Sequence, residues 1–225
     1  ALELPVEDEL ARVLPIIRHA VTLGVPVSVD TYKPAVMQAA LDLGADIIND
    51  IWALRWRADG DSPTGQQVVS THPNCGVCLM HMHRNPQTMQ IAPMEGDVVP
   101  QVLLFLKQLT QELRGLGVDS ARLCIDPGIG FGQTVQQNFE LLAKQSSLLS
   151  LGYPVLAGGS RKSSLAAVTL RSLANVATMD ARDRLVPSVT TALLAVQNGA
   201  RVVRVHDVKE KVQALKVFET MQQCG

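Results

Sequence analysis

The stretch that decides the fold is residues 25–50, VPVSVDTYKPAVMQAALDLGADIIND. It begins with a short apolar run ending in Asp30, continues through a segment that Pro34 opens and Gly44 closes, and ends in a second apolar run at 45–50. Proline in the first turn and glycine after the last turn are typical boundaries of a helix. Short Val- and Ile-rich runs are typical of parallel strands buried on both faces. The stretch therefore predicts a strand–helix–strand unit of a parallel sheet.

The same alternation continues along the chain. Further strands are predicted at 76–82, 122–126, 154–157 and 201–206, and helices at 6–22, 97–114, 135–149, 163–171, 183–197 and 207–222. The polar stretch 57–67 predicts a surface loop. The strands recur about every 35 residues, which is typical of βα units and fits either an open doubly wound sheet or a barrel. We favour an α/β fold, a (β/α)8 TIM barrel forming a single domain over residues 1–225, because every predicted strand ends in residues capable of chemistry.

Composition limits the functional classes. The chain has 225 residues, 47% of them hydrophobic, with a formal net charge of −1 and only 4% aromatic residues. This excludes a disordered chain and argues against a nucleic-acid partner, which usually requires a strongly basic surface. No apolar run is long enough to predict a membrane span, and no secretory signal is visible at the N-terminus. The four cysteines are too few for a disulfide scaffold and favour a reducing cytoplasm; we interpret Cys75 and Cys78 as buried structural thiols rather than half of a zinc site.

Acceptor groups follow three of the predicted strands. Asp30, Asn49 and Asp126 supply two carboxylates and an amide. In a barrel they would lie together at the carboxyl ends of the strands, where barrel active sites are found. Such acceptors could bind a heterocycle that carries amino and ring N–H donors. The alternative for each residue is a structural role in capping the loop that follows.

Cationic groups follow the last two predicted strands. Arg204 and His206 alternate on one strand, so we expect both side chains on the same side, where they could hold a phosphate. The alternative is an ion pair with Asp207, which we otherwise expect to cap the last helix. Lys162 could donate to a carbonyl or phosphate, or be a solvated surface lysine.

Two further motifs leave alternatives open. His81 and His83 would share a face if both lay on a strand, which is the arrangement of some barrel metal sites, although Arg84 disfavours a bound cation. The run Gly128–Gly132 has neither P-loop nor dinucleotide-fold spacing. Its glycines more plausibly form a tight turn beside a flat ligand, with Phe131 as a wall.

Six motifs in order resemble those of dihydropteroate synthases. The matching stretches are SVDT at 28–31, IND at 48–50, LMHM at 79–82 followed by PQTM at 86–89, DPGIGFG at 126–132, GGSRKS at 158–163, and RVHD at 204–207. The resemblance extends from about Leu10 to Val217. It implies a barrel enzyme of folate synthesis that joins 6-hydroxymethyl-7,8-dihydropterin diphosphate to 4-aminobenzoate and releases pyrophosphate.

The resemblance also implies residue roles. The pterin would be bound by Asp30, Asn49 and Asp126, lined by Met82 and Phe131, and contacted by Lys162. Gly158 would contact substrate, and Ser163 would face the aminobenzoate. Arg204 and His206 would hold the departing diphosphate with Mg²⁺. Lys162, Arg204, His206 and Asp126 are the expected catalytic residues. We also expect a homodimer, which the apolar stripe Val212, Leu215, Val217 and Phe218 could help to form.

One part of the family pattern does not occur in this sequence. The family begins with two strands that carry an Asn-Val-Thr-Pro-Asp-type motif and an Asp-x-Gly-Gly-type motif, so we expect the domain to be N-terminally incomplete here. The alternatives are a non-catalytic pterin-binding fragment, a barrel metallohydrolase, and a pterin-dependent methyltransferase.

Overall fold

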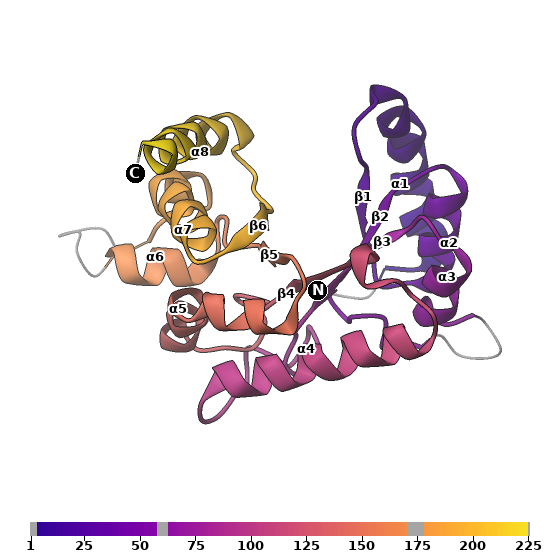
Figure 1. Ribbon diagram of the computed structural model, residues 1–225, viewed down its shortest axis with the longest axis horizontal. Coiled ribbons are helices and arrows are strands. Elements are labelled where there is room, and N and C mark those ends of the chain that lie inside the picture. The colour runs from indigo at the N-terminus through magenta and orange to yellow at the C-terminus, as the bar shows by residue number, and fades with distance from the viewer. Residues whose placement is uncertain (1–3, 58–62, 171–177, 225) are drawn as a thin grey trace. The chain divides into compact units, whose positions relative to one another are not determined.

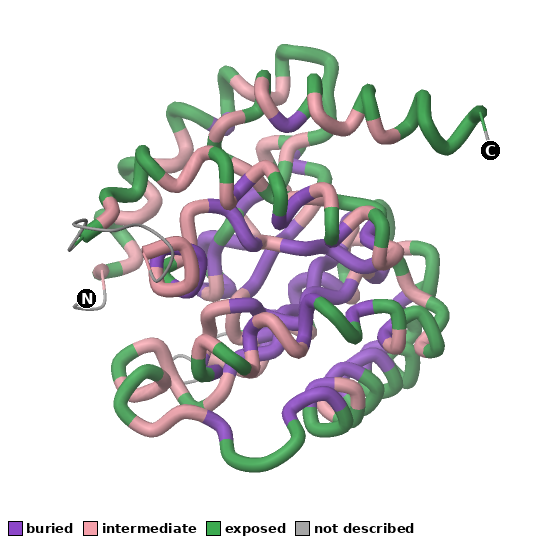
Figure 2. Tube along the Cα trace, turned by 90° about the vertical axis from the view of Figure 1, so that its left-hand side faces the viewer, coloured by how far each residue is buried: buried purple, intermediate pink, exposed green. Residues whose placement is uncertain are grey.

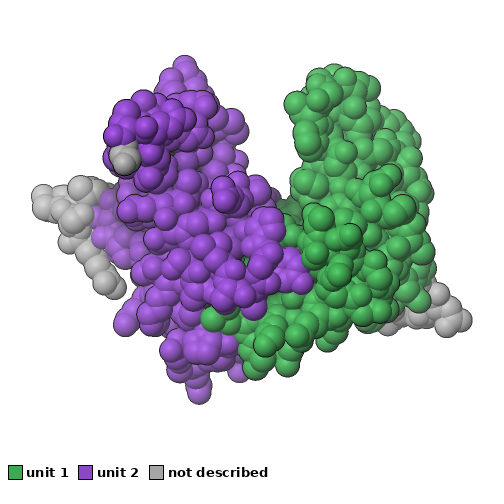
Figure 3. All heavy atoms as spheres, in the orientation of Figure 1, with its two compact units in different colours: residues 1–82, 102–126 green, residues 83–101, 127–225 purple. Residues whose placement is uncertain are grey.

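The structure, a computed structural model, describes residues 4–57, 63–170 and 178–224. The chain divides into two compact units, shown in different colours in Figure 3. Unit 1 comprises Ala1–Met82 and Val102–Asp126, and unit 2 comprises His83–Gln101 and Pro127–Gly225.

Unit 1 contains four strands that pair in parallel and in chain order (Figure 1). They are β1 (Ser28–Asp30), β2 (Ile47–Asp50), β3 (Gly76–Met80) and β4 (Leu123–Asp126). The helices are α1 (Val6–Ala20), α2 (Pro34–Asp42), α3 (Gly65–Thr71) and α4 (Val98–Gly115), of which α4 begins in unit 2, and there are short 3-10 turns at Val21–Leu23 and Ser120–Arg122. As predicted, α2 begins at Pro34 and Gly44 adopts a positive φ just beyond its end.

Unit 2 has two parallel strands, β5 (Val155–Ala157) and β6 (Ala200–Val203). Its helices are α5 (Val135–Ala143), α6 (Ser163–Leu170), α7 (Leu185–Gln197) and α8 (Val208–Gln223), with 3-10 segments at Gln145–Leu151 and Arg182–Arg184. A core cluster forms where strands and helices meet, built on Ile129, Leu142, Ala157, Ala195 and Ala200.

Burial follows the strands. In the central strands of unit 1, Ile48, Leu79 and Ile125 are completely buried. Figure 2 shows along the chain which segments are buried, in purple, and which are exposed, in green. This pattern explains why the predicted strands have almost no polar alternation. Among the described residues, no helix combines the length and the apolar character that a bilayer span requires.

Three details differ from the sequence predictions. The predicted loop at 57–67 contains the start of α3, whose first turn is closed by a capping box between Thr64 and Gln67; residues 58–62 lie outside the described part. The predicted helix at 135–149 becomes α5 followed by a 3-10 segment. The predicted strands at 76–82 and 201–206 end earlier, at Met80 and Val203, because the chain turns there into polar loops.

Candidate active site

In unit 1, the predicted acceptor groups lie on one face of the sheet. Asp30 is the register partner of Asn49, and Asn49 in turn is the partner of Cys78. Asp126 is the partner of Met80, two positions beyond Cys78 and therefore on the same face. The parallel register thus brings the three acceptor residues to the carboxyl ends of β1, β2 and β4, on one side.

The acceptors differ in burial. Asp30 is exposed, whereas Asn49 and Asp126 are only 8% and 5% exposed. The side-chain oxygen of Asn49 is buried and has no hydrogen-bond partner within the described part of the chain. A buried acceptor in this condition is costly unless a ligand or water donates to it. This face of the sheet therefore offers hydrogen-bond acceptors to a ligand that carries N–H groups.

Two thiols continue the same face. Cys78 is the register partner of Cys124, and neither forms a disulfide within the described residues. The hydrogen bond with Cys124, followed by burial, raises the pKa of the Cys78 thiol well above its usual range, and the charges of Asp126 and Asp30 act in the same direction. The buried Cys75 is also free, so the prediction that Cys75 and Cys78 are buried structural thiols is confirmed.

Asp50 points to the other face of β2 and has a structural function. Its two carboxylate oxygens accept hydrogen bonds from the backbone N–H groups of Trp52 and Leu54, at 2.8 and 2.7 Å. The side chain is completely buried, and burial raises its pKa from 3.8 to about 7 despite these bonds. Asp50 therefore caps the loop after β2, while Asn49 beside it faces the acceptor row.

In unit 2, the glycine-rich run forms the tight turn that the sequence predicts. Gly130 and Gly132 have φ values of +87° and +101°. A Cβ on Gly130 would contact Lys162, and one on Gly132 would overlap the Cβ of His83. Phe131 is half-buried between them, and the Lys162 Nζ lies 4.0 Å from the centroid of its ring. The turn therefore places an aromatic face directly against a cation.

The other cationic residues of unit 2 lie beyond the strand ends. Because β6 ends at Val203, Arg204 and His206 do not alternate along a strand as predicted, although the Arg204 N–H still donates to the carbonyl of Ala157 at 3.1 Å. Both side chains belong to exposed residues. Gly158 directly follows β5, and Ser163 is the exposed first residue of α6.

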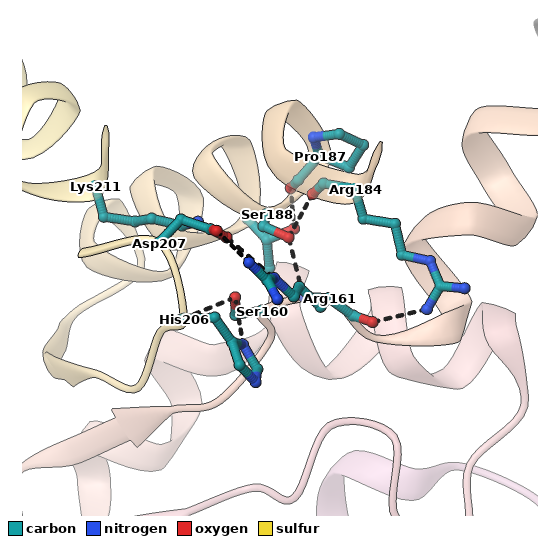
Figure 4. Close-up of polar contacts among 9 residues, drawn as sticks. Ser160, Arg161, Arg184, Pro187, Ser188, His206, Asp207 and Lys211 are labelled. Atoms are coloured by element: carbon teal, nitrogen blue, oxygen red, sulfur yellow. Dashed lines mark hydrogen bonds and ion pairs between the residues drawn. The ribbon is translucent and has the colours of Figure 1, made fainter. Parts of the chain in front are cut away.

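His206 is oriented by Ser160 (Figure 4). The Nδ1 atom of His206 lies 3.0 Å from the Ser160 hydroxyl, which also accepts the His206 backbone N–H at 3.4 Å. With Nδ1 engaged by Ser160, Nε2 is the ring nitrogen left to meet a ligand. Burial lowers the pKa of His206, and the charges of Arg161 and Arg204 lower it further, so the ring is neutral at pH 7.

Asp207 does not cap the last helix with its side chain, contrary to the prediction. It stands at the N-cap position of α8, but its carboxylate accepts hydrogen bonds from Arg161 and from Lys211, the latter at 2.9 Å, instead of capping the helix. The hydrogen bond from Arg161, followed by that from Lys211, holds the pKa of Asp207 far below its usual value. Asp207 thus belongs to an Arg161–Asp207–Lys211 network, in which neither cation was predicted as its partner.

The two histidines considered as metal ligands lie outside any strand. In unit 1 the His81 N–H donates to the carbonyl of Asp126, and its ring meets the edge of Phe105 at 4.9 Å. In unit 2 the His83 N–H donates to the carbonyl of Phe131. Within residues 4–57, 63–170 and 178–224, no group of three or more His, Cys, Asp or Glu side chains could hold a metal ion.

Several residues of these networks carried no prediction. Ser160 and Arg161 belong to the motif GGSRKS at 158–163, but neither was given a role. Lys211 could have been found as a partner of Asp207 from its i, i+4 spacing. Arg184 and Ser188 gave no signal, because they reach Arg161 only through the tertiary fold.

Comparison with known proteins shows the family of the chain. The family model described as pterin binding enzyme matches residues 1–206. A dihydropteroate synthase of Neisseria meningitidis serogroup C is 40% identical over 96% of this chain and 72% of its own length.

Solved structures give the same result. A Burkholderia cenocepacia dihydropteroate synthase complexed with 7,8-dihydropteroate is 44% identical, with a TM-score of 0.86 over 100% of this chain and 78% of that one. A Xanthomonas albilineans dihydropteroate synthase with 4-aminobenzoic acid is 42% identical, with a TM-score of 0.87 over 99% and 74% of the two chains. These relatives have the TIM-barrel fold, which confirms the predicted fold class. The chain therefore belongs to the pterin-binding enzymes, and within them to the dihydropteroate synthases.

Proposed function

We propose that this chain joins 6-hydroxymethyl-7,8-dihydropterin diphosphate to 4-aminobenzoate, giving 7,8-dihydropteroate and pyrophosphate. The bond from the pterin methylene carbon to the diphosphate oxygen breaks, a bond from that carbon to the amine nitrogen forms, and the amine loses one proton. The observation that carries this proposal is the distribution of polar groups at the strand ends. Hydrogen-bond acceptors, two of them buried, lie at the strand ends of unit 1, and cationic side chains follow the strands of unit 2.

The acceptor row matches the pterin edge. A pterin presents an amino group and ring N–H groups, which need acceptors. Asp30, Asn49 and Asp126 supply carboxylate and amide oxygens on one face, and the buried Asn49 oxygen lacks a donor within the described residues. We place Met82, which is 3% exposed, at the apolar part of this pocket.

The cations match the diphosphate. Arg204 offers a planar fork and Lys162 a point charge. The neutral His206 meets a phosphate oxygen through Nε2, because Ser160 occupies Nδ1. Donors fixed in place before reaction stabilise the charge that develops as the C–O bond breaks.

The aromatic turn completes the proposed site. Phe131 is held by the turn and offers a ring face to the substrate. In a dissociative reaction a cation forms early on the substrate, and the dihydropterin ring would delocalise its charge. We place Gly158 and Ser163 on the substrate side of the turn after β5, with Ser163 toward the aminobenzoate. The amine nitrogen then attacks the methylene carbon.

Magnesium and a dimer are further parts of the proposal. Since the described residues offer no cluster of three metal ligands, the residues present do not form a resident magnesium site, and we propose that Mg²⁺ enters as the magnesium complex of the diphosphate substrate. We also propose a homodimer, which the exposed apolar residues Val212 and Val217 of α8 support. The four cysteines, too few for a disulfide scaffold, favour the reducing cytoplasm as its compartment.

The test is pyrophosphate release by the chain in the presence of the pterin diphosphate and Mg²⁺, with and without 4-aminobenzoate. We expect release that depends on the amine, that EDTA suppresses, and that Lys162→Met reduces by about 100-fold or more, because one charged donor to the transition state is lost. Release that is independent of the amine would indicate a hydrolase and refute the proposal.

A further inference from the structure

The turn between β5 and α6 contains one residue in an unfavourable conformation. Arg161 has a φ of +59°, in the left-handed region that residues with a Cβ rarely adopt. Its neighbours in sequence are Ser160, which orients His206, and Lys162, which lies over Phe131. The conformation of Arg161 therefore sets the direction of both neighbouring side chains.

Both backbone groups of Arg161 are held by α7 and the 3-10 segment before it, through Ser188 and Arg184 (Figure 4). The Arg161 N–H donates to the Ser188 hydroxyl at 2.9 Å, and the Arg161 carbonyl accepts from Nη1 of Arg184 at 2.8 Å. The Ser188 hydroxyl in turn donates to the carbonyl of Arg184 at 2.5 Å. Arg184 is fixed by a second bond from Nη2 to the carbonyl of Met179 at 2.8 Å. These bonds fix the peptide units on both sides of Arg161, and we call the pair Arg184 and Ser188 the clamp.

The side chain of Arg161 is fixed independently. It donates from Nε and Nη2 to the two carboxylate oxygens of Asp207. Asp207 is held in turn by Lys211, which is only 1% exposed. A left-handed residue that is held at its N–H, its carbonyl and its side chain has no freedom to return to a commoner conformation.

From this geometry we infer that Arg184 and Ser188 are positioning residues, which lock the Arg161 turn so that Ser160 orients His206 and Lys162 meets the substrate. Neither residue touches the reacting atoms in this inference, and both act through Arg161. The inference rests on the proposed function for its meaning in catalysis, but the geometry of the clamp can be tested without turnover.

The test compares Ser188→Ala and Arg184→Met with Thr190→Ala. Thr190 lies on the same helix as Ser188, and its hydroxyl likewise donates to the carbonyl four residues earlier, at 3.0 Å. Unlike Ser188, Thr190 is exposed, and within the described residues its hydroxyl bonds to its own helix and not to the Arg161 turn. It therefore controls for the loss of a helix hydroxyl. Thermal unfolding of each variant establishes that it is folded at the temperature of the test, and Ser188→Ala is the milder change if Arg184→Met does not fold.

The first readout is the titration of the His206 imidazole by NMR. Burial and the charges of Arg161 and Arg204 lower its pKa in the intact turn, with Lys211 acting in the same direction and Asp207 opposing them. Release of the clamp should move the midpoint upward, because the desolvation and the nearby charges that lower it depend on the intact turn. Thr190→Ala should leave it unchanged.

The second readout is the affinity for inorganic pyrophosphate, which we expect the clamp variants to lower by about 10- to 100-fold. An unchanged His206 midpoint in folded Ser188→Ala and Arg184→Met, together with pyrophosphate affinity equal to that of Thr190→Ala, would overturn the inference. If the wild-type chain binds pyrophosphate but does not turn over, the proposed function fails while the positioning inference is still decided by these two readouts.

Discussion

Replacing Asp50 with asparagine should remove most of the pH dependence that this residue gives to stability between pH 4 and pH 7. Burial raises the pKa of Asp50 from 3.8 to about 7 in the folded chain. A carboxyl group with a raised pKa binds its proton more tightly when folded than when unfolded. Its contribution to stability is therefore fully present below the unfolded value and is lost as the pH rises through about 7.

The magnitude follows from the size of the shift. A rise from 3.8 to about 7 corresponds to about 4 kcal/mol of unfolding free energy, at roughly 1.4 kcal/mol for each pKa unit. Asparagine does not titrate, so the variant lacks this dependence. The substitution also weakens the bonds to the N–H groups of Trp52 and Leu54, but that loss is nearly independent of pH and cancels in the comparison of two pH values.

The assay is urea denaturation of the wild-type chain and Asp50→Asn at steps from pH 4 to pH 8. The difference in unfolding free energy between the two proteins should change by about 4 kcal/mol across the range, in the direction that favours the variant at high pH. A difference that stays constant from pH 4 to pH 8 would show that Asp50 ionises normally, and would refute the reasoning from its burial.

Three further predictions concern the candidate site. Asn49→Ala should weaken binding of the pterin by about 10-fold, since one buried hydrogen-bond acceptor is removed; equal affinity in calorimetry would remove Asn49 from the pterin pocket. Gly132→Ala should lower the unfolding free energy by more than about 2 kcal/mol, because the residue has a φ of +101° and its new Cβ would overlap His83; an unchanged denaturation midpoint would contradict this. His206→Gln should bind pyrophosphate with an affinity ratio to wild type that is flat between pH 7 and 8 and that worsens as the medium becomes more acidic, because the lowered pKa of His206 keeps the wild-type ring neutral at pH 7 and above; an affinity ratio that changes between pH 7 and 8 would show a normal or raised pKa.

Much of the fold could be predicted because local signals and burial agree. Strands such as 45–50 are apolar without alternation, and Pro34 and Gly44 mark the ends of the helix before it, so the pattern specifies a βα unit without any tertiary information. The missed helix α3 also had a local signal, the Thr64–Gln67 capping box, which the polar composition of its surroundings concealed.

The candidate site was predictable only in part. Asp30, Asn49 and Asp126 could be placed together because the parallel register follows from the strand order. The role of Asp207 could not be predicted, since its partner Arg161 lies 46 residues earlier in the chain and meets it only in the folded unit. A side chain at an N-cap position serves either the helix or a distant cation, and sequence alone does not decide between them.

The central claim is that the chain forms a carbon–nitrogen bond, and product analysis tests it most directly. The chain is incubated with the pterin diphosphate, Mg²⁺ and 4-aminobenzoate labelled with ¹⁵N at its amine, and the products are separated and identified by mass spectrometry. We predict 7,8-dihydropteroate that carries the label, with one pyrophosphate released for each molecule formed. Pyrophosphate accompanied by unlabelled hydroxymethyl-dihydropterin would contradict the claim, because water rather than the amine would then have taken the carbon.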